Sequence, residues 1–435
     1  MSLHKKFFFS LIFIAFSSAA FGQAARTPFS TFGIGEPYGN ALIQSQGMGG
    51  IGVSQPQFWS VNNQNPALLV YNYYTGFQTG ALIESRTIKS DSISQKGVNG
   101  NLNYLVTAFP IKPGKWTTSV GLMPYTNVNY KLVYEEPVID NNNPNDPPVD
   151  TAGVLERGDG GLTQLYWSNG VRVHKNFSVG LKATYLFGSV NTDYANELAV
   201  TNQPVPFIVG IEEQTYVKDF MFSGGLSFSK DSLLKDDYRF SAGLVYSFAT
   251  ALNANKTTVI QRRSSSGNPV TSDTLIADKG SINIPSSFTL GVSLSKGVRW
   301  AGGAEFSVQD WSQFKSINKE DEGLEKSWRI SAGGEITPNQ LANNYLKRIT
   351  YRVGLSYEKN PFLVENPIES GVYNAVKDIG INFGFSLPTG RSSLDWGFRI
   401  GKRGNKVETI LEETYYKIYF GISFNDQWFI KRKFD

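Results

Sequence analysis

Three glycines near the N-terminus come closest to a recognised chemical motif. Gly47, Gly49 and Gly52 have the spelling of a dinucleotide-binding fingerprint, in which glycines let the backbone approach a pyrophosphate at a helix N-terminus. That fingerprint needs a strand before it and a helix after it, and the sequence predicts neither here. We therefore interpret these glycines as turn and close-packing residues.

Side chains suited to catalysis or metal binding are scarce. The histidines are His4 and His174, and the chain has no cysteine. Histidine-based triads, histidine clusters, thiolate sites and disulfides are therefore excluded. We expect no catalytic residues, no enzyme activity, no metal and no cofactor. One acidic stretch lacks the regular spacing of a calcium loop and is interpreted as a solvated loop; it contains Glu135, Glu136, Asp140, Asp146 and Asp150.

The composition narrows the ways in which this chain could interact with a membrane. Its 435 residues include 43 Gly, 30 Phe, 21 Tyr and 8 Trp, but only 40% are hydrophobic and the mean hydropathy is −0.24. After Phe16 no apolar run approaches the roughly 18 residues that a spanning helix needs. The formal net charge of +4 gives no support for nucleic-acid binding. A membrane protein of this composition would have to be a β-barrel.

The N-terminus has the pattern of a cleavable secretory signal peptide. Two lysines precede an apolar run at Phe7–Phe16, and small residues follow the run. We predict that residues 1–22 are the signal peptide, with cleavage near Gly22 or Gln23. A membrane-anchored start is the alternative, but the run is short and no stop-transfer pattern follows.

From about Tyr73 onward, segments of about ten residues alternate apolar with small or polar residues, which is the pattern of transmembrane β-strands. Near the C-terminus the alternation places five large apolar residues on one face: Tyr416, Ile418, Phe420, Ile422 and Phe424. A soluble β-sandwich also alternates, but its strands are shorter, about five or six residues. The predicted fold is all-β: a single transmembrane antiparallel β-barrel of about 14 strands with an N-terminal plug in the lumen.

The lengths of the predicted links give the barrel an orientation. Short links follow strands two, four, eight and twelve, at Lys112–Gly114, His174–Asn176, Lys296–Val298 and Pro388–Arg391, while the links after strands six and ten are exceptions and less short. Long links follow odd-numbered strands, at Glu135–Gly160, Thr192–Thr215 and Asn253–Ile284. Outer-membrane barrels alternate short periplasmic turns with longer extracellular loops. We therefore predict an outer-membrane location with both termini in the periplasm.

The segment at residues 23–70 lacks the alternation and is rich in Gly, Gln and Asn. It is either a hatch that plugs the lumen or a periplasmic linker. We favour the hatch, because a lumen this wide would otherwise be an open channel. The predicted domains are therefore the signal peptide at 1–22, the hatch at 23–70 and the barrel at 71–435.

Pro124 lies inside the third predicted strand, where a proline removes a ladder hydrogen-bond donor. Within a sheet, proline is expected at an edge, a bulge or a kink. A closed barrel has no edge. Pro124 therefore indicates either a harmless bulge near the rim or a break in the wall through which an apolar molecule leaves sideways into lipid.

Three short motifs, in this order along the chain, resemble the FadL-like outer-membrane transport proteins. They are Gln46–Val53, Asn65–Pro66–Ala67–Leu68 and Gly121–Tyr125. The first two look like the hatch of that family, and the third looks like its kinked third strand. The resemblance implies that the hatch motif comprises Gly47, Gly49, Gly50, Asn65, Pro66 and Ala67. It also implies that Pro124 and Tyr125 form the kink of a lateral wall opening.

This resemblance implies passive uptake of hydrophobic small molecules, such as long-chain fatty acids, with outer-membrane lipid around the barrel. The sequence style, including Gln23 and the Asp310–Trp311–Ser312 turn, looks like Bacteroidetes proteins. Some FadL-like barrels there serve type nine secretion. The alternative function is therefore a non-transporting barrel that acts as a partner or shuttle in a secretion complex.

Overall fold

The computed structural model describes residues 26–90, 94–138, 150–198, 208–232, 237–264, 266–317, 322–366, 369 and 371–427. The expected signal peptide lies outside the described residues, as do Asp140 and Asp146 of the acidic stretch. None of the described helices is long and apolar enough to cross a bilayer.

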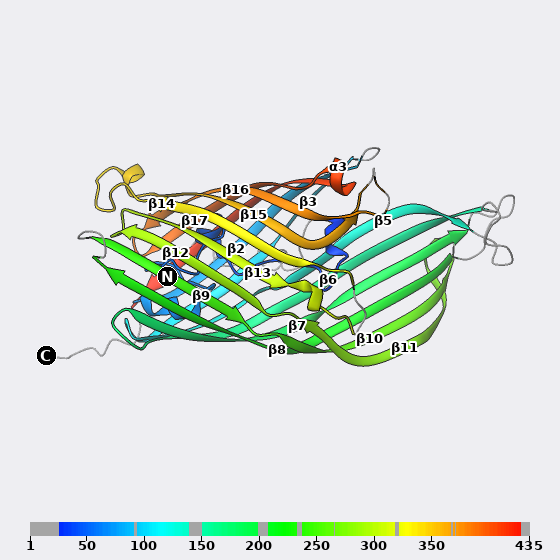
Figure 1. Cartoon of the computed structure of the whole chain (residues 1–435), viewed down its shortest axis with the longest axis horizontal. Coiled ribbons are helices and arrows are strands. Elements are labelled where there is room, and N and C mark those ends of the chain that lie inside the picture. Colours follow the sequence, from blue (N-terminus) through cyan, green and yellow to red (C-terminus); the bar gives the residue numbers. More distant parts are fainter. Residues whose placement is uncertain are drawn as a thin grey trace, which may run out of the picture.

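The wall is a closed antiparallel sheet (Figure 1), in which the last strand pairs with the first, Glu412–Asp426 with Thr75–Lys89. The strands are β2 (Thr75–Lys89), β3 (Ser94–Lys112), β4 (Trp116–Pro124), β5 (Thr126–Val138), β6 (Asp150–Arg172), β7 (Phe177–Leu198), β8 (Ile208–Asp231), β9 (Tyr238–Ser247), β10 (Thr250–Arg263), β11 (Pro269–Ile284), β12 (Ser287–Lys296), β13 (Trp300–Asp310), β14 (Lys326–Ile336), β15 (Thr350–Glu365), β16 (Tyr373–Thr389), β17 (Ser392–Gly404) and β18 (Glu412–Asp426).

Three strands of the barrel are each broken into two segments. β4 and β5 both pair with β6, β9 and β10 both pair with β8, and β11 continues into β12. Counted this way, the wall is a barrel of 14 strands, which confirms the predicted fold class. Short 3-10 helices η3 (Trp311–Gln313) and η4 (Tyr345–Lys347) and helix α3 (Lys406–Thr409) lie in the links.

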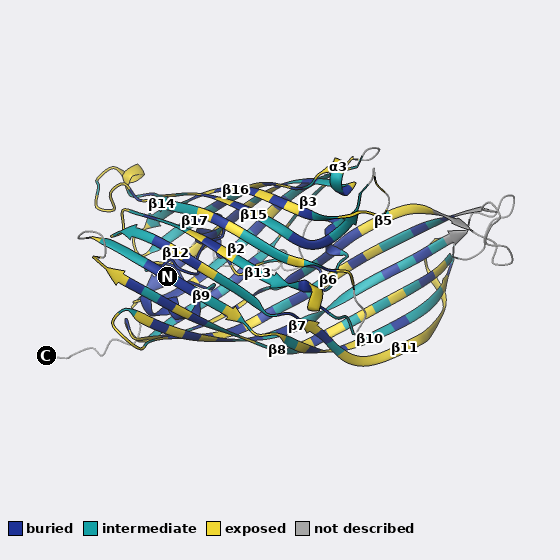
Figure 2. Ribbon diagram, viewed as in Figure 1, coloured by how far each residue is buried: buried dark blue, intermediate teal, exposed yellow. Residues whose placement is uncertain are grey.

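The alternation read from the sequence sets the two faces of the wall. In β18, Tyr415, Tyr419 and Ser423 are buried in the lumen, whereas Tyr416 and Phe424 are exposed on the outside. Because successive side chains of a strand point to opposite faces, an apolar outer face and a small or polar inner face follow from the same ten-residue pattern. Figure 2 shows these alternating bands of exposed and buried residues.

The strands are longer than the alternation indicated. The three predicted long links are largely strand: β5 pairs with β6 from Val128–Gly160 to Val138–Asp150, β7 continues to Leu198, and β10 pairs with β11. The error has a physical cause, because a strand with water on its outer face needs no apolar residues there and loses the hydrophobic period.

These extensions form a sheet that stands beyond the rest of the barrel (Figure 1). We call it the projection, and it comprises residues 131–138, 150–158, 191–198, 208–216, 254–263 and 269–280. The opposite end of the barrel, where β2 begins and β18 ends, carries the short links after β3, β6, β12 and β16. We call it the turn end.

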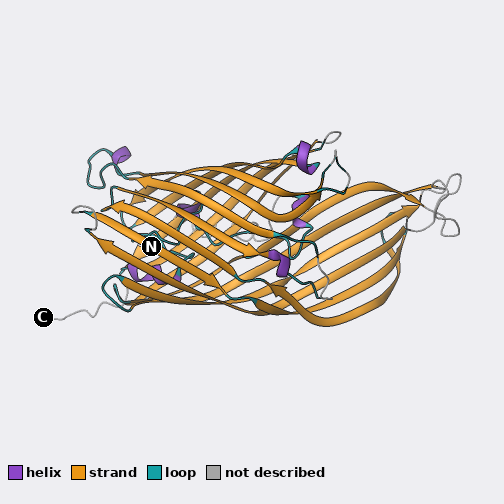
Figure 3. Cartoon of the chain, viewed as in Figure 1, coloured by secondary structure: helices purple, strands orange, loops and turns teal. Residues whose placement is uncertain are grey.

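Residues 26–72, called the hatch here, lie inside the barrel and are mostly loop (Figure 3). Their elements are η1 (Pro28–Ser30), β1 (Glu36–Pro37), α2 (Ile43–Gln46) and η2 (Pro66–Tyr71). Ala67, Leu68, Leu69 and Val70 have no exposed surface. The hatch therefore adds buried apolar side chains to a lumen in which residues such as Tyr104, Leu162 and Trp311 are buried as well.

Candidate functional site

The glycines of the wall mark where the hatch lies. At several inward-facing glycines, an added Cβ would come within 3.0 Å of the hatch backbone, so no larger side chain fits. They are Gly170, Gly180, Gly243, Gly333 and Gly354. The hatch main chain therefore packs directly against five strands of the wall, namely β6, β7, β9, β14 and β15. Alternation alone did not reveal this contact, although a glycine on the inward face of successive strands is the signal that would have indicated it.

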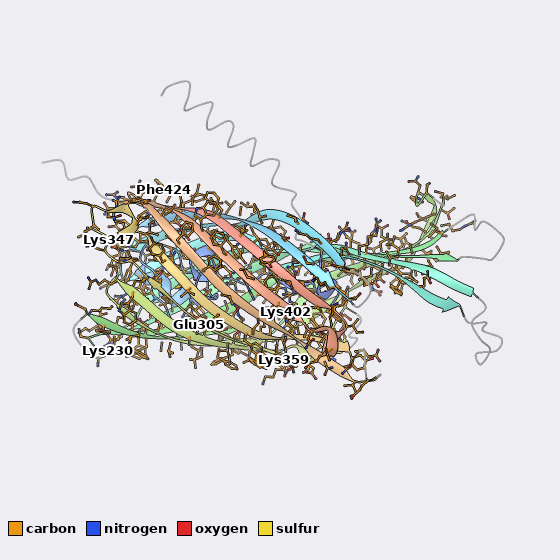
Figure 4. The ribbon with its side chains drawn as sticks, turned by 90° about the horizontal axis from the view of Figure 1, so that it is seen from above. Lys230, Glu305, Lys347, Lys359, Lys402 and Phe424 are labelled. Carbon is orange, nitrogen blue, oxygen red and sulfur yellow. The ribbon has the colours of Figure 1, made fainter. Side chains whose placement is uncertain are left out.

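The glycine-rich stretch of the hatch is bound by wall side chains. Glu305 of β13 accepts hydrogen bonds from the backbone N–H groups of Gly52 (2.6 Å) and Val53; Figure 4 labels its position on the wall. Arg329 donates to the Gly49 carbonyl at 2.8 Å. Gly49 has a φ of +76°, a conformation that glycine adopts without strain. The N–H groups at Gly52 and Val53 are thus bound to a carboxylate of the protein itself.

The Asn65–Pro66–Ala67 motif starts the short helix η2. The Asn65 side chain accepts from Ala67 N–H (3.0 Å) and donates to the carbonyls of Val53 (2.8 Å) and Leu226 (3.0 Å). Pro66 occupies the first turn, where a missing N–H costs nothing. Asn65 therefore caps the helix and joins two parts of the hatch to strand β8.

A buried group of charged side chains lies between the hatch and strands β2, β16, β17 and β18. We call it the lumen charge cluster, and it comprises Glu36, Glu84, Arg86, Asp378, Arg399, Arg403, Glu413 and Lys417. Arg86 contacts Glu36 and Glu413, both at 2.9 Å, and Arg403 contacts Glu36 at 2.7 Å. Its four acids and four bases balance in number, as buried charges require.

Glu36 connects the hatch to this cluster. Burial opposes ionisation of its carboxyl group, but the guanidinium groups of Arg403 and Arg86 outweigh burial and hold the pKa of Glu36 well below its ordinary value. The hatch is therefore attached to the wall by an ionised carboxylate as well as by packing.

Three lysine and arginine side chains outside the main part of this cluster's ion pairs also have partners within the protein. Lys417 contacts Glu84 at 3.4 Å, and Arg239 contacts Asp231 at 2.5 Å. Lys182 donates to Asn63 Oδ1 at 3.1 Å and lies 4.2 Å from the centre of the Tyr166 ring.

The wall is interrupted beside strand three. The ladder between β3 and β4 ends at the Leu105–Leu122 pair. Beyond that pair β3 continues to Ser94 and pairs with β2, while β5 pairs with β6. We call the interruption between β3 and β5 the wall gap. Pro124 is the last residue of β4, and Tyr125 lies between the two segments.

The hatch closes the wall gap with residues Glu36–Tyr38, which we call the strap. Glu36 and Pro37 pair with Asn127 and Thr126 of β5. The Tyr38 backbone N–H donates to the Tyr125 carbonyl at 3.0 Å. On the other side of the gap, the Tyr38 hydroxyl accepts a hydrogen bond from Asn101 of β3. The strap therefore joins the two strands that the barrel leaves unpaired.

The strands beside the break at Pro124 contain glycines in unusual backbone conformations. Gly160 and Gly161 in β6 and Gly188 in β7 have φ values of +107°, +133° and +152°. An added Cβ on each would come within 3.0 Å of a backbone oxygen of the adjacent strand. These glycines let the two strands bend beside the break between β4 and β5. Pro124 was visible in the sequence as a break, whereas the glycines were not recognised.

The described residues enclose a cavity near the breaks in the wall and a second one at the turn end. A cavity of about 170 Å³ touches all three broken strands, at Tyr125, Ser247 and Pro285. A larger cavity of about 320 Å³ lies at the turn end and is lined by Gln55, Trp59, Glu335, Arg352 and Asp395, among others. An apolar cluster of hatch and wall residues includes Phe29, Ile34, Leu162, Leu186, Trp311 and Phe314.

Comparison with solved structures defines the class of fold. A Pseudomonas aeruginosa FadL homologue superimposes with a TM-score of 0.57 at 12% identity, covering 89% of this chain and 98% of that one. The monoaromatic hydrocarbon channel CymD gives 0.54 at 15%, covering 91% and 99%. The Pseudomonas putida toluene transporter TodX gives 0.51 at 16%, covering 90% and 98%. This chain therefore has the FadL-like β-barrel fold.

The family is shown by the sequence itself. A model of the BamG family matches residues 3–435, so the chain belongs to the BamG family. A search of curated proteins finds no match.

Proposed function

We propose that this protein is an outer-membrane barrel through which a hydrophobic small molecule passes sideways, by way of the wall gap between β3 and β5. The observation that carries the proposal is the interrupted ladder between β3 and β4, beside which the strap contacts both β3 and β5. A break in the wall gives an apolar molecule a route into lipid that avoids the aqueous periplasm.

The outer surface supports placement in a membrane. Large apolar side chains are exposed around the barrel, among them Ile330, Leu355, Ile381, Ile400 and Phe420. Lys230 and Lys347 lie at the turn end, and Lys359 and Lys402 lie toward the rim from which the projection leaves (Figure 4). An apolar band between two charged rims is the surface of a membrane barrel. With a cleaved signal peptide, the turn end would face the periplasm.

The interior supports a lateral route. The cavity at the turn end mixes polar residues such as Gln55, Glu335 and Arg352 with the aromatic residues Phe58, Trp59 and Trp300, and it lies away from the strap. The hatch lies directly on the wall glycines. The apolar cluster and the smaller cavity, by contrast, include Leu162 and Tyr125 beside the wall gap. We infer that the ligand enters from the projection end and leaves through the gap when the strap moves.

Locking the strap tests this proposal. Pro37 and Thr126 face each other in the ladder, and their neighbours Tyr38 and Tyr125 are hydrogen-bonded. The pair is therefore of the non-hydrogen-bonded type, with Cα atoms about 4.5 Å apart, which suits a disulfide. The natural chain has no cysteine, so a Pro37→Cys/Thr126→Cys variant would contain a single defined crosslink.

We expect the oxidised variant to lose uptake of labelled oleate or toluene by cells, and a reductant to restore it. A Gln261→Cys/Ser272→Cys pair in the β10–β11 ladder is the control and should transport in both states. If the locked strap leaves uptake unchanged, lateral transport through this gap is wrong.

A further inference from the structure

The outermost strand of the projection has an unpaired edge. β11 pairs with β10 from Pro269–Arg263 to Ile284–Thr250. On its other edge, the first described backbone partner is Lys315, which meets Asn283 near the base of the strand. Between Pro269 and Lys279, no described residue forms a backbone pair with this edge of β11. A row of backbone N–H and C=O groups is left free along this edge of β11.

This edge is also unusually exposed. Every residue from Pro269 to Gly280 is exposed on β11, which Figure 2 shows as a continuous run. Three of them are large apolar residues: Val270 and Leu275 are 56% exposed and Ile276 is 46% exposed. Proteins usually protect such edges with lysines, prolines or a covering segment. On β11 these devices are Pro269, the charged residues Asp273, Asp278 and Lys279, and the register shift opposite Thr258 and Val259.

The projection presents a polar outer face, unlike the band below it. Asn191 of β7 donates to Asp159 of β6 and accepts from Gln214 of β8. Gln261 of β10 donates to Glu212 of β8 at 2.9 Å. A row of amides and carboxylates is costly in hydrocarbon. The β11 edge therefore stands in water, where a polypeptide can reach it.

We infer that the outer part of β11, residues 269–280, binds an extended segment of a partner protein by adding a strand to the projection. Main-chain hydrogen bonds to the free edge would supply affinity, and alternate side chains would supply specificity. The inference rests on the membrane placement proposed above. It does not depend on transport through the wall gap.

A second copy of this chain does not fit the edge. Copies in one membrane share one orientation, so their β11 strands run in the same direction relative to the bilayer. Antiparallel pairing of the two edges would require one barrel to be inverted. We take the partner to be a different protein, whose added strand is free to run in either direction.

The residues of the edge define the chemistry of this partner. Val270, Leu275 and Ile276 favour apolar side chains on the added strand. Asp273 and Asp278 form no ion pair among the residues that the structure describes, and they favour a basic side chain opposite them. We therefore expect a short extended segment that mixes β-branched or aromatic residues with lysine or arginine.

Amide hydrogen exchange in native membranes tests the inference without a known partner. In the purified barrel, amides over residues 269–280 should exchange quickly, because one edge is open. In outer membranes from the natural host, their exchange should be on the order of tenfold slower. Equal rates in the two preparations would overturn the inference. Protection that appears in purified protein at high concentration would indicate self-association, and would overturn it as well.

Two variants link any protection to the edge. Leu275→Lys/Ile276→Lys places charges on the free strand and should keep exchange fast in native membranes. Val209→Lys is the matched control, because Val209 is exposed on β8, a strand that is paired on both sides. It should retain the protection seen in the wild type. Protection that survives the double substitution would show that this edge is not the binding site. Both variants should transport normally, which separates this outcome from the strap test.

Discussion

At the scale of single residues, the wall glycines contribute most to positioning the hatch. Two neighbouring glycines in β8 allow a matched test. A Cβ on Gly225 would come within 3.0 Å of the Asn65 side-chain oxygen and of Pro66, whereas one on Gly224 would lie 3.9 Å from its nearest neighbour. Gly225 therefore faces the Asn65–Pro66–Ala67 motif and Gly224 faces outward.

We expect Gly225→Ala to lower the free energy of unfolding by about 1–3 kcal/mol through overpacking. Gly224→Ala should change it by less than about 0.5 kcal/mol. Urea unfolding of the detergent-solubilised barrel, followed by tryptophan fluorescence, measures both. Equal effects of the two substitutions would contradict the contact between hatch and wall.

The strap carboxylate gives a second prediction at this scale. The pKa of Glu36 is lower in the folded protein than its ordinary value of 4.5, because Arg403 and Arg86 outweigh the effect of burial. The ionised form therefore stabilises the fold above about pH 4.5, and this contribution is lost as the pH falls toward the folded-state pKa. Glu36→Gln should lower the melting temperature at pH 7 and flatten its decline below pH 4.5. Glu408→Gln, at an exposed ion pair with Lys377, is the control and should follow the wild-type curve.

At the scale of elements, the break in strand three has several causes. Pro124 ends β4, but the strap holds β5 on its free edge, and Gly160, Gly161 and Gly188 bend the adjacent strands. We therefore expect Pro124→Ala to leave the wall gap in place. In that background, the Pro37→Cys/Thr126→Cys disulfide should form with unchanged yield on air oxidation. Loss of the disulfide would show that the proline alone keeps β3 and β5 apart.

The elements also show what the sequence predicts and what it does not. The barrel wall was predictable, because residues such as Tyr416, Ile418 and Phe420 must face lipid while their neighbours face the lumen. The extensions of β5 to β11 were read as loops, because strands such as Pro269–Ile284 have water on both faces and no hydrophobic period. Pro124 was identifiable because proline disturbs any ladder. The pairing of the strap with Thr126 and Asn127 was not, since a two-residue strand has no periodicity.

Only part of the candidate site could be predicted from the sequence, for a similar reason. The glycine-rich stretch and Asn65–Pro66–Ala67 stood out by composition, and the structure places both against the wall. The lumen charge cluster did not, because its members come from β2, β16, β17, β18 and the hatch. Arg86 and Glu413 are far apart in sequence but 2.9 Å apart in space. Only the register of a closed barrel brings them together.

At the scale of the whole molecule, the fold combines a rigid plugged band with a protruding sheet. The lower wall is sealed by pairs that run from β2 through β18 and back. The projection begins at the level of the barrel where three strands are interrupted, after β4, β9 and β11. The proposed transport and the proposed partner binding therefore involve different parts of the chain, the first the strap and the second β11.

The ring of wall glycines also constrains the order of assembly. The hatch backbone touches strands from β6 to β15, so it occupies the centre of a cylinder whose seam lies between β2 and β18. A segment that fits this closely has little room to thread into a finished cylinder. We expect the hatch to be in place before β2 and β18 pair, so that residues 26–72 form a core around which the strands close.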